Sequence, residues 1–275
     1  GLCVDRLIDW SENQVVDRGL VLGFHKFHTD TQVVAYKGYP LSENFHPHLC
    51  PSTDEMEAKV HPRETWVIGK GNKAALRSTH SEADIHVGPA LRYKSIFSAS
   101  PVKAQRSSLL VGLSVESSEC EEMPTLLKTA TPYLPESLPV HIKPHPMLPR
   151  EKLNVGSDWN HDRWLWVEGE FSRHLRTARV LCTNVSSTAL EALVAGVPVL
   201  LLGRRGNITW HPIPKAVSQE AWALCFSAEE LVSALEGFLG LSSDSREAVS
   251  GQIRDEYLSE PNAENVRSLL GMTEE

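Results

Sequence analysis

The sequence lacks the long apolar runs of membrane-spanning segments. None of its 275 residues falls in a stretch that approaches the roughly 18 to 20 consecutive apolar residues needed to cross a bilayer. The N-terminus also lacks the basic-then-apolar pattern of a signal peptide. We therefore predict a cytoplasmic protein.

Paired cysteines are missing as well. The five cysteines are odd in number and scattered, without a Cys-x-x-Cys pair, which argues against a disulfide framework. His46, His48 and Cys50 occupy alternate positions, so their side chains could bind a metal from one side of an extended segment. Pro47 and Pro51 fit an irregular surface loop equally well, so we expect reduced thiols and assign no metal site.

A large basic surface is not expected either. The formal net charge is -8, whereas proteins that bind a phosphate backbone depend on clustered lysines and arginines. Nucleic acid is therefore a poor candidate partner. With 41% hydrophobic and 23% charged residues, the chain has an ordinary globular composition and is long enough for two compact units.

From residue 107 onward, apolar runs alternate with helical patterns. Strands separated by helices in this way indicate a parallel sheet with helices on both faces. We therefore predict a Rossmann-like domain over residues 107–275, ending in a helix, a break at Pro261 and a second helix that could pack back across the linker. The expected strands are 108–115, 138–144, 163–169, 179–184 and 197–203, and the expected helices between them are 121–134, 171–178 and 187–196.

The first hundred residues contain fewer elements. A helix over 11–27 is expected to open at Ser11, with Gln14 completing a capping box, and three extended runs follow. This is too little for a whole α/β domain. We expect an incomplete domain over 1–100, either because the native polypeptide extends upstream or because the chain is a fragment. The polar, proline-containing stretch 95–108 is typical of an interdomain linker.

A histidine follows the second strand of the C-terminal domain. His145 lies between Pro144 and Pro146, just beyond the carboxyl end of a predicted parallel strand, where open α/β sheets bind ligands. The two prolines restrict the backbone, so the imidazole would be held in one direction. A fixed imidazole can donate to a phosphate oxygen, and Lys143 adds positive charge. The alternative is a turn with a surface histidine.

Two serines follow the fourth strand. Thr188 and Glu191 fit a capping box that makes Thr188 the expected N-cap of a helix, and Ser186 and Ser187 then lie in the strand-to-helix turn. Hydroxyls beside a helix N-terminus suit an anion such as phosphate. A serine-rich loop that only starts a helix is the alternative. Together with His145, these residues would bracket a monophosphate or diphosphate.

The two motifs support a resemblance to a known family. "KPHP", followed about forty residues later by "SSTALEALVAGVPVLLLG", resembles the donor half of bacterial GT-B glycosyltransferases that build surface polysaccharides such as capsule and O-antigen. The motifs are similar to those of sialyltransferases and Kdo transferases that use CMP-activated sugars. The resemblance implies that His145 contacts the CMP phosphate and that Ser186 and Ser187 bind phosphate and cytidine. In the first half, "DWSENQVVDRGLVLGF" is similar to a segment of capsule and O-antigen biosynthesis proteins.

One motif of the family is missing. The bacterial sialyltransferases carry an acidic-acidic-Gly motif whose acid is the general base in the acceptor domain, and residues 1–106 contain no such triplet. An inverting transferase still needs a group that takes the acceptor proton. We predict Glu12, expected in the first turn of the opening helix, for this catalytic role; Asp9 and Asp17 are the alternatives. Alternatively, Glu12 has a purely structural role, because an acidic residue in the first turn of a helix interacts favourably with the helix dipole.

Two arginines follow the fifth strand. Sialic acid and Kdo carry a carboxylate, for which Arg204 and Arg205 offer bidentate partners. The predicted donor-binding set is Lys143, His145, Ser186, Ser187, Thr188, Arg204 and Arg205, and the predicted catalytic pair is Glu12 and His145.

The resemblance implies a two-domain, GT-B-like α/β protein with Rossmann-like domains. It would be a metal-independent glycosyltransferase without a cofactor, moving a sialic acid- or Kdo-like sugar from a CMP donor to a glycan or lipid-linked glycan. Such a protein would associate peripherally with the inner membrane or an assembly complex. Three alternatives stay open: a CDP-glycerol-type polyol-phosphate transferase, a nucleotide-sugar 2-epimerase, and a non-catalytic nucleotide-sugar-binding module.

Overall fold

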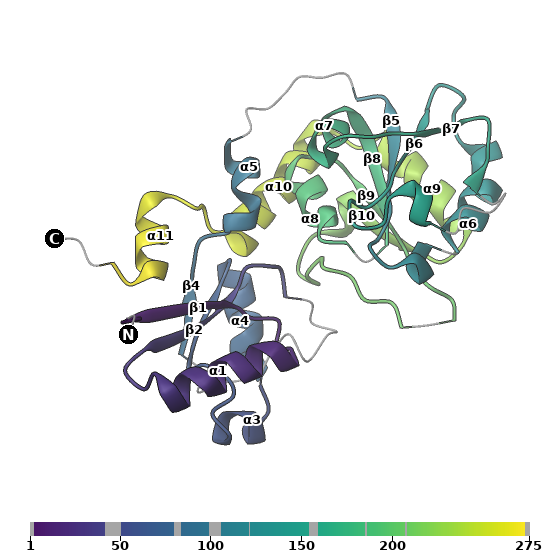
Figure 1. Cartoon of the computed structure of the whole chain (residues 1–275). Coiled ribbons are helices and arrows are strands. Elements are labelled where there is room, and N and C mark those ends of the chain that lie inside the picture. The colour runs from purple at the N-terminus through teal and green to yellow at the C-terminus, as the bar shows by residue number, and fades with distance from the viewer. Residues whose placement is uncertain are drawn as a thin grey trace. The chain divides into compact units, whose positions relative to one another are not determined.

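The chain divides into two compact units, each with its own parallel sheet. Unit 1 comprises Gly1–Ser98 and Gln252–Glu275, and unit 2 comprises Ala99–Gly251. Figure 1 shows both as ribbons. The computed structural model describes residues 3–41, 51–79, 84–98, 106–120, 122–153, 159–184, 186–206 and 208–272.

Unit 1 is built on a four-stranded parallel sheet with the order β1-β2-β3-β4. Its second to fourth strands match the extended runs predicted from the sequence, whereas the first was not predicted. β1 is short and carries two charged residues in five positions, so its apolar signal is weak. The strands are β1 (Arg6–Trp10), β2 (Gln32–Lys37), β3 (Glu64–Val67) and β4 (Asp84–Val87), and the helices between or after them are α1 (Val15–Phe27), α3 (Thr53–Glu57), α4 (Lys70–Thr79) and α5 (Lys94–Ser98).

The opening helix begins later than predicted. Gln14, not Ser11, is the N-cap of α1, and Asp17 Oδ2 accepts the backbone N–H groups of Glu12 and Gln14 at 3.0 and 2.9 Å. Ser11 instead extends β1, because its N–H donates to the Tyr36 carbonyl at 3.1 Å. Glu12 therefore lies in the loop between β1 and α1, and the prediction that it occupies the first helical turn is wrong.

Unit 2 contains a six-stranded parallel sheet with the order β10-β9-β8-β5-β6-β7. The five predicted strands and three predicted helices are confirmed, with shorter bounds. β10 and α9 were not predicted. The strands are β5 (Ser108–Gly112), β6 (Val140–Lys143), β7 (Trp164–Trp166), β8 (Ala178–Thr183), β9 (Val199–Leu202) and β10 (Trp222–Cys225), and the helices are α6 (Met123–Ala130), α7 (Phe171–Thr177), α8 (Thr188–Val194) and α9 (Ala228–Leu239).

Helices cover both faces of this sheet (Figure 1). On one face, Leu109 and Val111 of β5 join a buried cluster with residues of α6 and α9. The alternating position Gly112 faces the other way, toward the Phe171 ring of α7. Because both faces are covered, the strands β5 and β9 are buried at every position and consist mostly of apolar residues, which is why their sequence signal was strong.

The C-terminal segment returns to unit 1. α10 (Ser243–Tyr257) and α11 (Ala263–Leu270) flank Ser259, which donates to the Ile68 carbonyl at 2.6 Å and accepts from Ala90 N–H at 2.8 Å. The predicted C-terminal domain, 107–275, therefore extends further than unit 2, because residues 252–275 group with unit 1. Among the described helices, none has both the length and the apolar character to cross a membrane.

Candidate functional site

Three strands of unit 2 end at the same level. Gly112, the last residue of β5, pairs with Lys143 of β6 on one side and with Thr183 of β8 on the other. Thr183 Oγ1 donates to the Gly112 carbonyl at 2.8 Å, and Leu113 N–H donates to the Lys143 carbonyl at 3.0 Å. Neighbouring strands are about 4.8 Å apart, so the segments after β6 and β8 leave the sheet roughly 10 Å apart.

His145 is held in a tight turn directly after β6. Leu148 N–H donates to the His145 carbonyl at 3.0 Å, and Met147 N–H donates to His145 Nδ1 at 3.2 Å. A neutral imidazole that accepts at Nδ1 carries its proton on Nε2, so the ring presents Nε2 as a donor. Lys143 Nζ donates to the Pro144 carbonyl at 3.2 Å, which keeps its charge beside this turn.

The two serines lie at the start of α8, as expected, but the N-cap is one residue earlier than predicted. Ser187 is the N-cap and Thr188 the first helical residue, so the prediction of Thr188 as N-cap is wrong. Ser186 Oγ accepts the Thr188 N–H at 3.3 Å and lies 2.8 Å from Thr188 Oγ1. Ser186 thus ties the turn to the helix, and the two hydroxyls form one polar group.

Sequence reasoning missed three polar residues at the same edge. Ser114 follows β5, Thr183 ends β8 and Asn184 follows it, and all three are buried. Ser186 N–H donates to the Asn184 carbonyl at 3.1 Å. The sequence does place polar residues at the ends of these two buried runs. They were overlooked because the predicted strands 108–115 and 179–184 included them.

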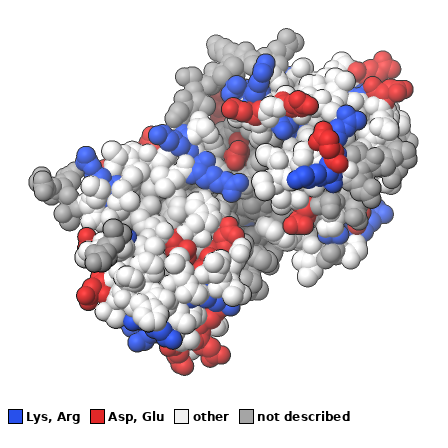
Figure 2. All heavy atoms as spheres, in the orientation of Figure 1, with Lys and Arg blue, Asp and Glu red and all other residues white. Residues whose placement is uncertain are grey.

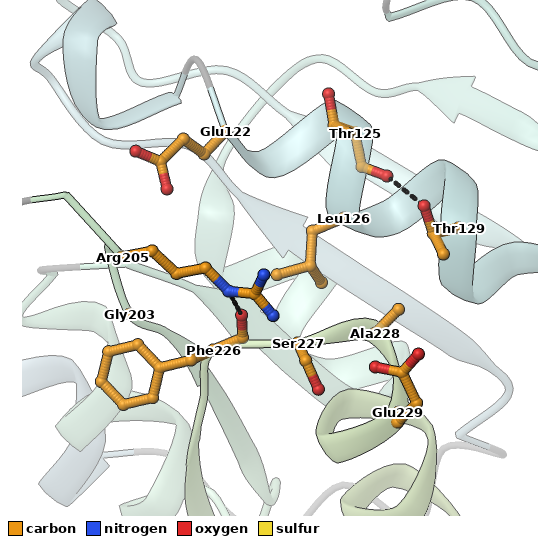
Figure 3. A pocket seen from close by; sticks show the side chains of 10 residues that line it. All are labelled: Glu122, Thr125, Leu126, Thr129, Gly203, Arg205, Phe226, Ser227, Ala228 and Glu229. Carbon is orange, nitrogen blue, oxygen red and sulfur yellow. Dashed lines mark hydrogen bonds between the residues drawn. The ribbon is translucent and has the colours of Figure 1, made fainter.

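The two arginines are placed differently from each other. Arg205 lines a 440 Å³ cavity formed by the ends of β9 and β10, one side of α6 and the first turn of α9 (Figure 3). Its Nε donates to the Phe226 carbonyl at 2.8 Å, and its two Nη groups point into the cavity. Arg204 is not among the lining residues, and its N–H donates to Thr209 Oγ1 at 2.9 Å. Only Arg205 is therefore oriented toward a ligand in this cavity.

The shape of this cavity depends on a glycine. A Cβ on Gly203 would lie 2.2 Å from Phe226 Cε1, so the ring packs directly against the backbone there. The remaining lining residues carry hydroxyl, carboxylate and aliphatic groups: Glu122, Thr125, Leu126, Thr129, Ser227, Ala228 and Glu229.

The carboxyl edge of the unit 1 sheet is also polar. Glu12 is half-buried, and its two carboxylate oxygens accept from Trp10 Nε1 at 3.1 Å and Gln14 Nε2 at 2.8 Å. The neighbouring Asp9 and Lys37 are much more deeply buried. The alternative carboxylate Asp9 is thus the more enclosed of the two, whereas Asp17 fixes the loop.

The described residues also show how metal-ligand types and surface charge are distributed. Within the described ranges, no group of three or more His, Cys, Asp or Glu residues could hold a metal ion. The predicted alternation of His46, His48 and Cys50 lies outside these ranges. On the face drawn in Figure 2, basic and acidic side chains are interspersed, unlike the continuous basic surface that binds a nucleic-acid backbone.

Solved structures share the fold at low sequence identity. A protein described as a UDP-N-acetylglucosamine 2-epimerase from Listeria monocytogenes has a TM-score of 0.65 and 16% identity, over 98% of this chain and 75% of that one. The Methanocaldococcus jannaschii UDP-GlcNAc 2-epimerase, in complex with UDP-GlcNAc and UDP, has a TM-score of 0.60 and 15% identity, over 90% and 75%. The lipopolysaccharide outer core galactosyltransferase WaaB has a TM-score of 0.53 and 13% identity, over 98% and 76%.

These similarities establish the fold class. The chain has the two parallel-sheet, Rossmann-like units of the GT-B fold that these epimerases and glycosyltransferases share. No protein-family model matches the sequence, and no curated protein matches it. The narrower resemblance to CMP-sugar transferases of capsule or O-antigen synthesis therefore stays a prediction.

Proposed function

We propose that the protein is an enzyme that acts on a nucleotide-activated sugar and holds the nucleotide phosphates at the carboxyl edge of β5, β6 and β8. The observation that carries this proposal is the common end point of the three strands at Gly112, Lys143 and Thr183. The turn that contains His145 and the turn that contains Ser186 and Thr188 therefore lie at the same edge of the sheet. Open α/β sheets bind nucleotides at this edge.

The chemistry of this edge suits a phosphate leaving group. His145 offers Nε2–H, Lys143 a positive charge, and Ser186 and Thr188 their hydroxyl groups. Donors placed where negative charge develops stabilise a departing phosphate without a metal. The Arg205 cavity would accept a further polar part of the donor, such as sugar hydroxyl groups, because its lining combines the Arg205 guanidinium with the Glu122 and Glu229 carboxylates.

Among the reactions open to such a site, 2-epimerisation of a UDP-sugar has the better support. The two epimerase structures have higher TM-scores than the galactosyltransferase, and one was solved with UDP-GlcNAc and UDP bound. Glycosyl transfer is the second candidate, and the WaaB similarity favours it. A CMP-activated sialic acid- or Kdo-like donor remains supported by the His-Pro and Ser-Ser motifs alone.

Calorimetry with single nucleotides tests the proposal. We expect UDP to bind more tightly than CDP or CMP, and His145→Ala to weaken UDP binding about tenfold or more, because a hydrogen bond to a charged group contributes roughly 1.5 to 3 kcal/mol. His28→Ala, a change at an exposed histidine of unit 1, is the matched control and should bind UDP like the wild type.

Three results would change the assignment. Binding of CMP without UDP would return the donor to the CMP class. Binding of UDP with neither epimerisation nor transfer of UDP-GlcNAc would favour a non-catalytic binding module. Absence of binding by all three nucleotides would contradict the proposed function itself.

A further inference from the structure

One helix of unit 1 presents large apolar side chains to solvent. The exposed fractions are 83% for Val15, 71% for Val16, 39% for Leu20 and 81% for Phe27, all on α1. Val21 lies on the opposite side of the helix and is buried. Single exposed apolar residues are common on protein surfaces, whereas a contiguous apolar patch marks an interaction site.

These side chains and two glycines lie on one side of α1. With about 100° between successive helical residues, positions 15, 16, 19, 20, 23 and 27 fall within an arc of about 140°. A Cβ on Gly19 or Gly23 would meet nothing within 4 Å, so both glycines face open space. Figure 1 shows α1 along the outside of unit 1. The apolar face of α1 comprises Val15, Val16, Gly19, Leu20, Gly23 and Phe27.

The two glycines indicate which kind of partner fits this face. A glycine inside a helix weakens it relative to alanine, and it adds no apolar side chain for a lipid surface to bury. It does allow the backbone of another helix to approach closely. Neighbouring acids also disfavour an anionic membrane, because α3, joined to α1 by the Arg18–Glu55 ion pair at 2.5 Å, carries three acidic residues in five positions.

The spacing along the helix makes the face complementary to itself in an antiparallel pair. At 1.5 Å per residue, the midpoint between Gly19 and Gly23 lies about 8 Å from the level of Val15 and Val16 and about 9 Å from that of Phe27. Two copies that cross antiparallel at the glycines therefore place the Phe27 ring of each against the two valines of the other. Such an isologous contact closes as a two-fold dimer.

The charges at the two ends of α1 complement each other in the same arrangement. Asp17 in the first turn and Glu12 just before the helix are acidic, whereas His25 and Lys26 in the last turn are basic. Lys26 lies on the same side of the helix as the apolar face. An antiparallel pair brings the basic end of each helix beside the acidic end of its partner, and the opposed helix dipoles favour the same orientation.

We propose that the apolar face of α1 is the surface through which two copies of this chain associate as an antiparallel dimer. A contact made by one helix face is smaller than the roughly 800 Å² per partner of a standard interface, so we expect a dissociation constant on the order of 10 μM. Below about 1 μM the chain is then monomeric, and unfolding measured at that dilution reports on the single chain.

Gly19→Leu tests the close helix packing without disturbing the single chain. A leucine there meets open space in the monomer and has the better helix propensity, but in the dimer it lies between the two backbones. Sedimentation velocity over a concentration series should show a wild-type dimer above about 50 μM, and the dissociation constant of the variant should be about tenfold higher or more. Gly237→Leu, in α9, where a Cβ also meets nothing within 4 Å, is the matched control and should dimerise like the wild type.

Photo-crosslinking tests the antiparallel orientation. Benzoylphenylalanine in place of Phe27 should link two copies, and mass spectrometry should find the link on Val15 or Val16 of the partner subunit. Within one helix, position 27 is about 18 Å from position 15, so such a link does not arise inside a single chain. Links between the two positions 27 would indicate a parallel pair and overturn the antiparallel assignment.

Three further results would overturn the proposal. A wild type that stays monomeric at about 200 μM contradicts a dimer. Association of Gly19→Leu as tight as that of the wild type contradicts packing through the glycines. Binding of the wild type to vesicles made of equal parts of phosphatidylethanolamine and phosphatidylglycerol, with tighter binding by Gly19→Leu, would assign the face to a lipid surface instead.

Discussion

We expect one half-buried histidine to make the stability of this protein depend on pH. His141 of β6 is half-buried, and both its burial and the nearby His174 hold its pKa below the ordinary value. The unfolded chain therefore takes up a proton at about pH 6.5, before the folded chain does. The stabilising contribution of neutral His141 is present above that pH and is lost as the pH falls below it.

His141→Gln should reduce this sensitivity. We expect the free energy of unfolding of the wild type, measured with urea, to fall more steeply between pH 7 and pH 5.5 than that of the variant. The comparison at pH 8, where the histidine is neutral in both states, serves as the internal control for packing. Equal slopes for the two proteins would show that another group dominates the acid response.

At the scale of elements, helix caps determine where the loops of the candidate site begin. Ser227, the N-cap of α9, accepts the Glu230 N–H at 3.2 Å and also lines the Arg205 cavity. α9 packs against α6, β8, β9 and β10, so its first turn forms one wall of the cavity. The position of this wall depends on the cap.

Ser227→Ala should destabilise unit 2 by about 1 kcal/mol, the usual loss for an N-cap serine. Urea denaturation monitored by circular dichroism gives the value. Ser233→Ala, at an exposed position of the same helix, removes an identical hydroxyl and should leave the stability unchanged or slightly higher. A loss at Ser233 equal to that at Ser227 would contradict a capping role.

At the scale of the whole molecule, unit 1 is completed by residues from the far end of the chain. Asn72 Nδ2 donates to the Tyr257 carbonyl at 3.1 Å, and a Cβ on Gly69 would lie 2.3 Å from the Tyr257 carbonyl carbon. The backbone of the C-terminal segment therefore occupies the space that a side chain at position 69 would need. Tyr257 and Ser259 of the C-terminal segment therefore contribute to the packing of unit 1.

Gly69→Ala should displace this segment and cost about 1 to 3 kcal/mol, the range for overpacking a tight contact. Urea denaturation measures the loss, and hydrogen exchange should show weaker protection at Ser259 N–H. Gly23→Ala is the matched control, because a Cβ in α1 meets nothing within 4 Å and removes a helix-weakening glycine. It should stabilise the protein by up to about 1 kcal/mol. Equal effects at both positions would contradict this account of the C-terminal segment.

The sequence predicted unit 2 well and unit 1 less completely, for a physical reason. Strands such as "SLLVG" and "VLLL" are buried on both faces and therefore consist mostly of apolar residues. β1 carries Arg6 and Asp9 in a five-residue strand, and its apolar run is too short to be distinguished from a loop. The start of α1 was misplaced because a capping pattern at Ser11 competes with the true cap at Gln14.

By itself, the sequence determined the α/β class and the strand ends that carry His145, Ser186 and Ser187, because periodicity and turn residues are local properties of the chain. Only the tertiary structure decided three matters: that β5, β6 and β8 end in register, that Asp9 rather than Glu12 is the enclosed carboxylate, and that residues 252–275 belong with unit 1. Each of these depends on contacts between residues far apart in the chain, and local patterns do not encode burial or register between distant segments.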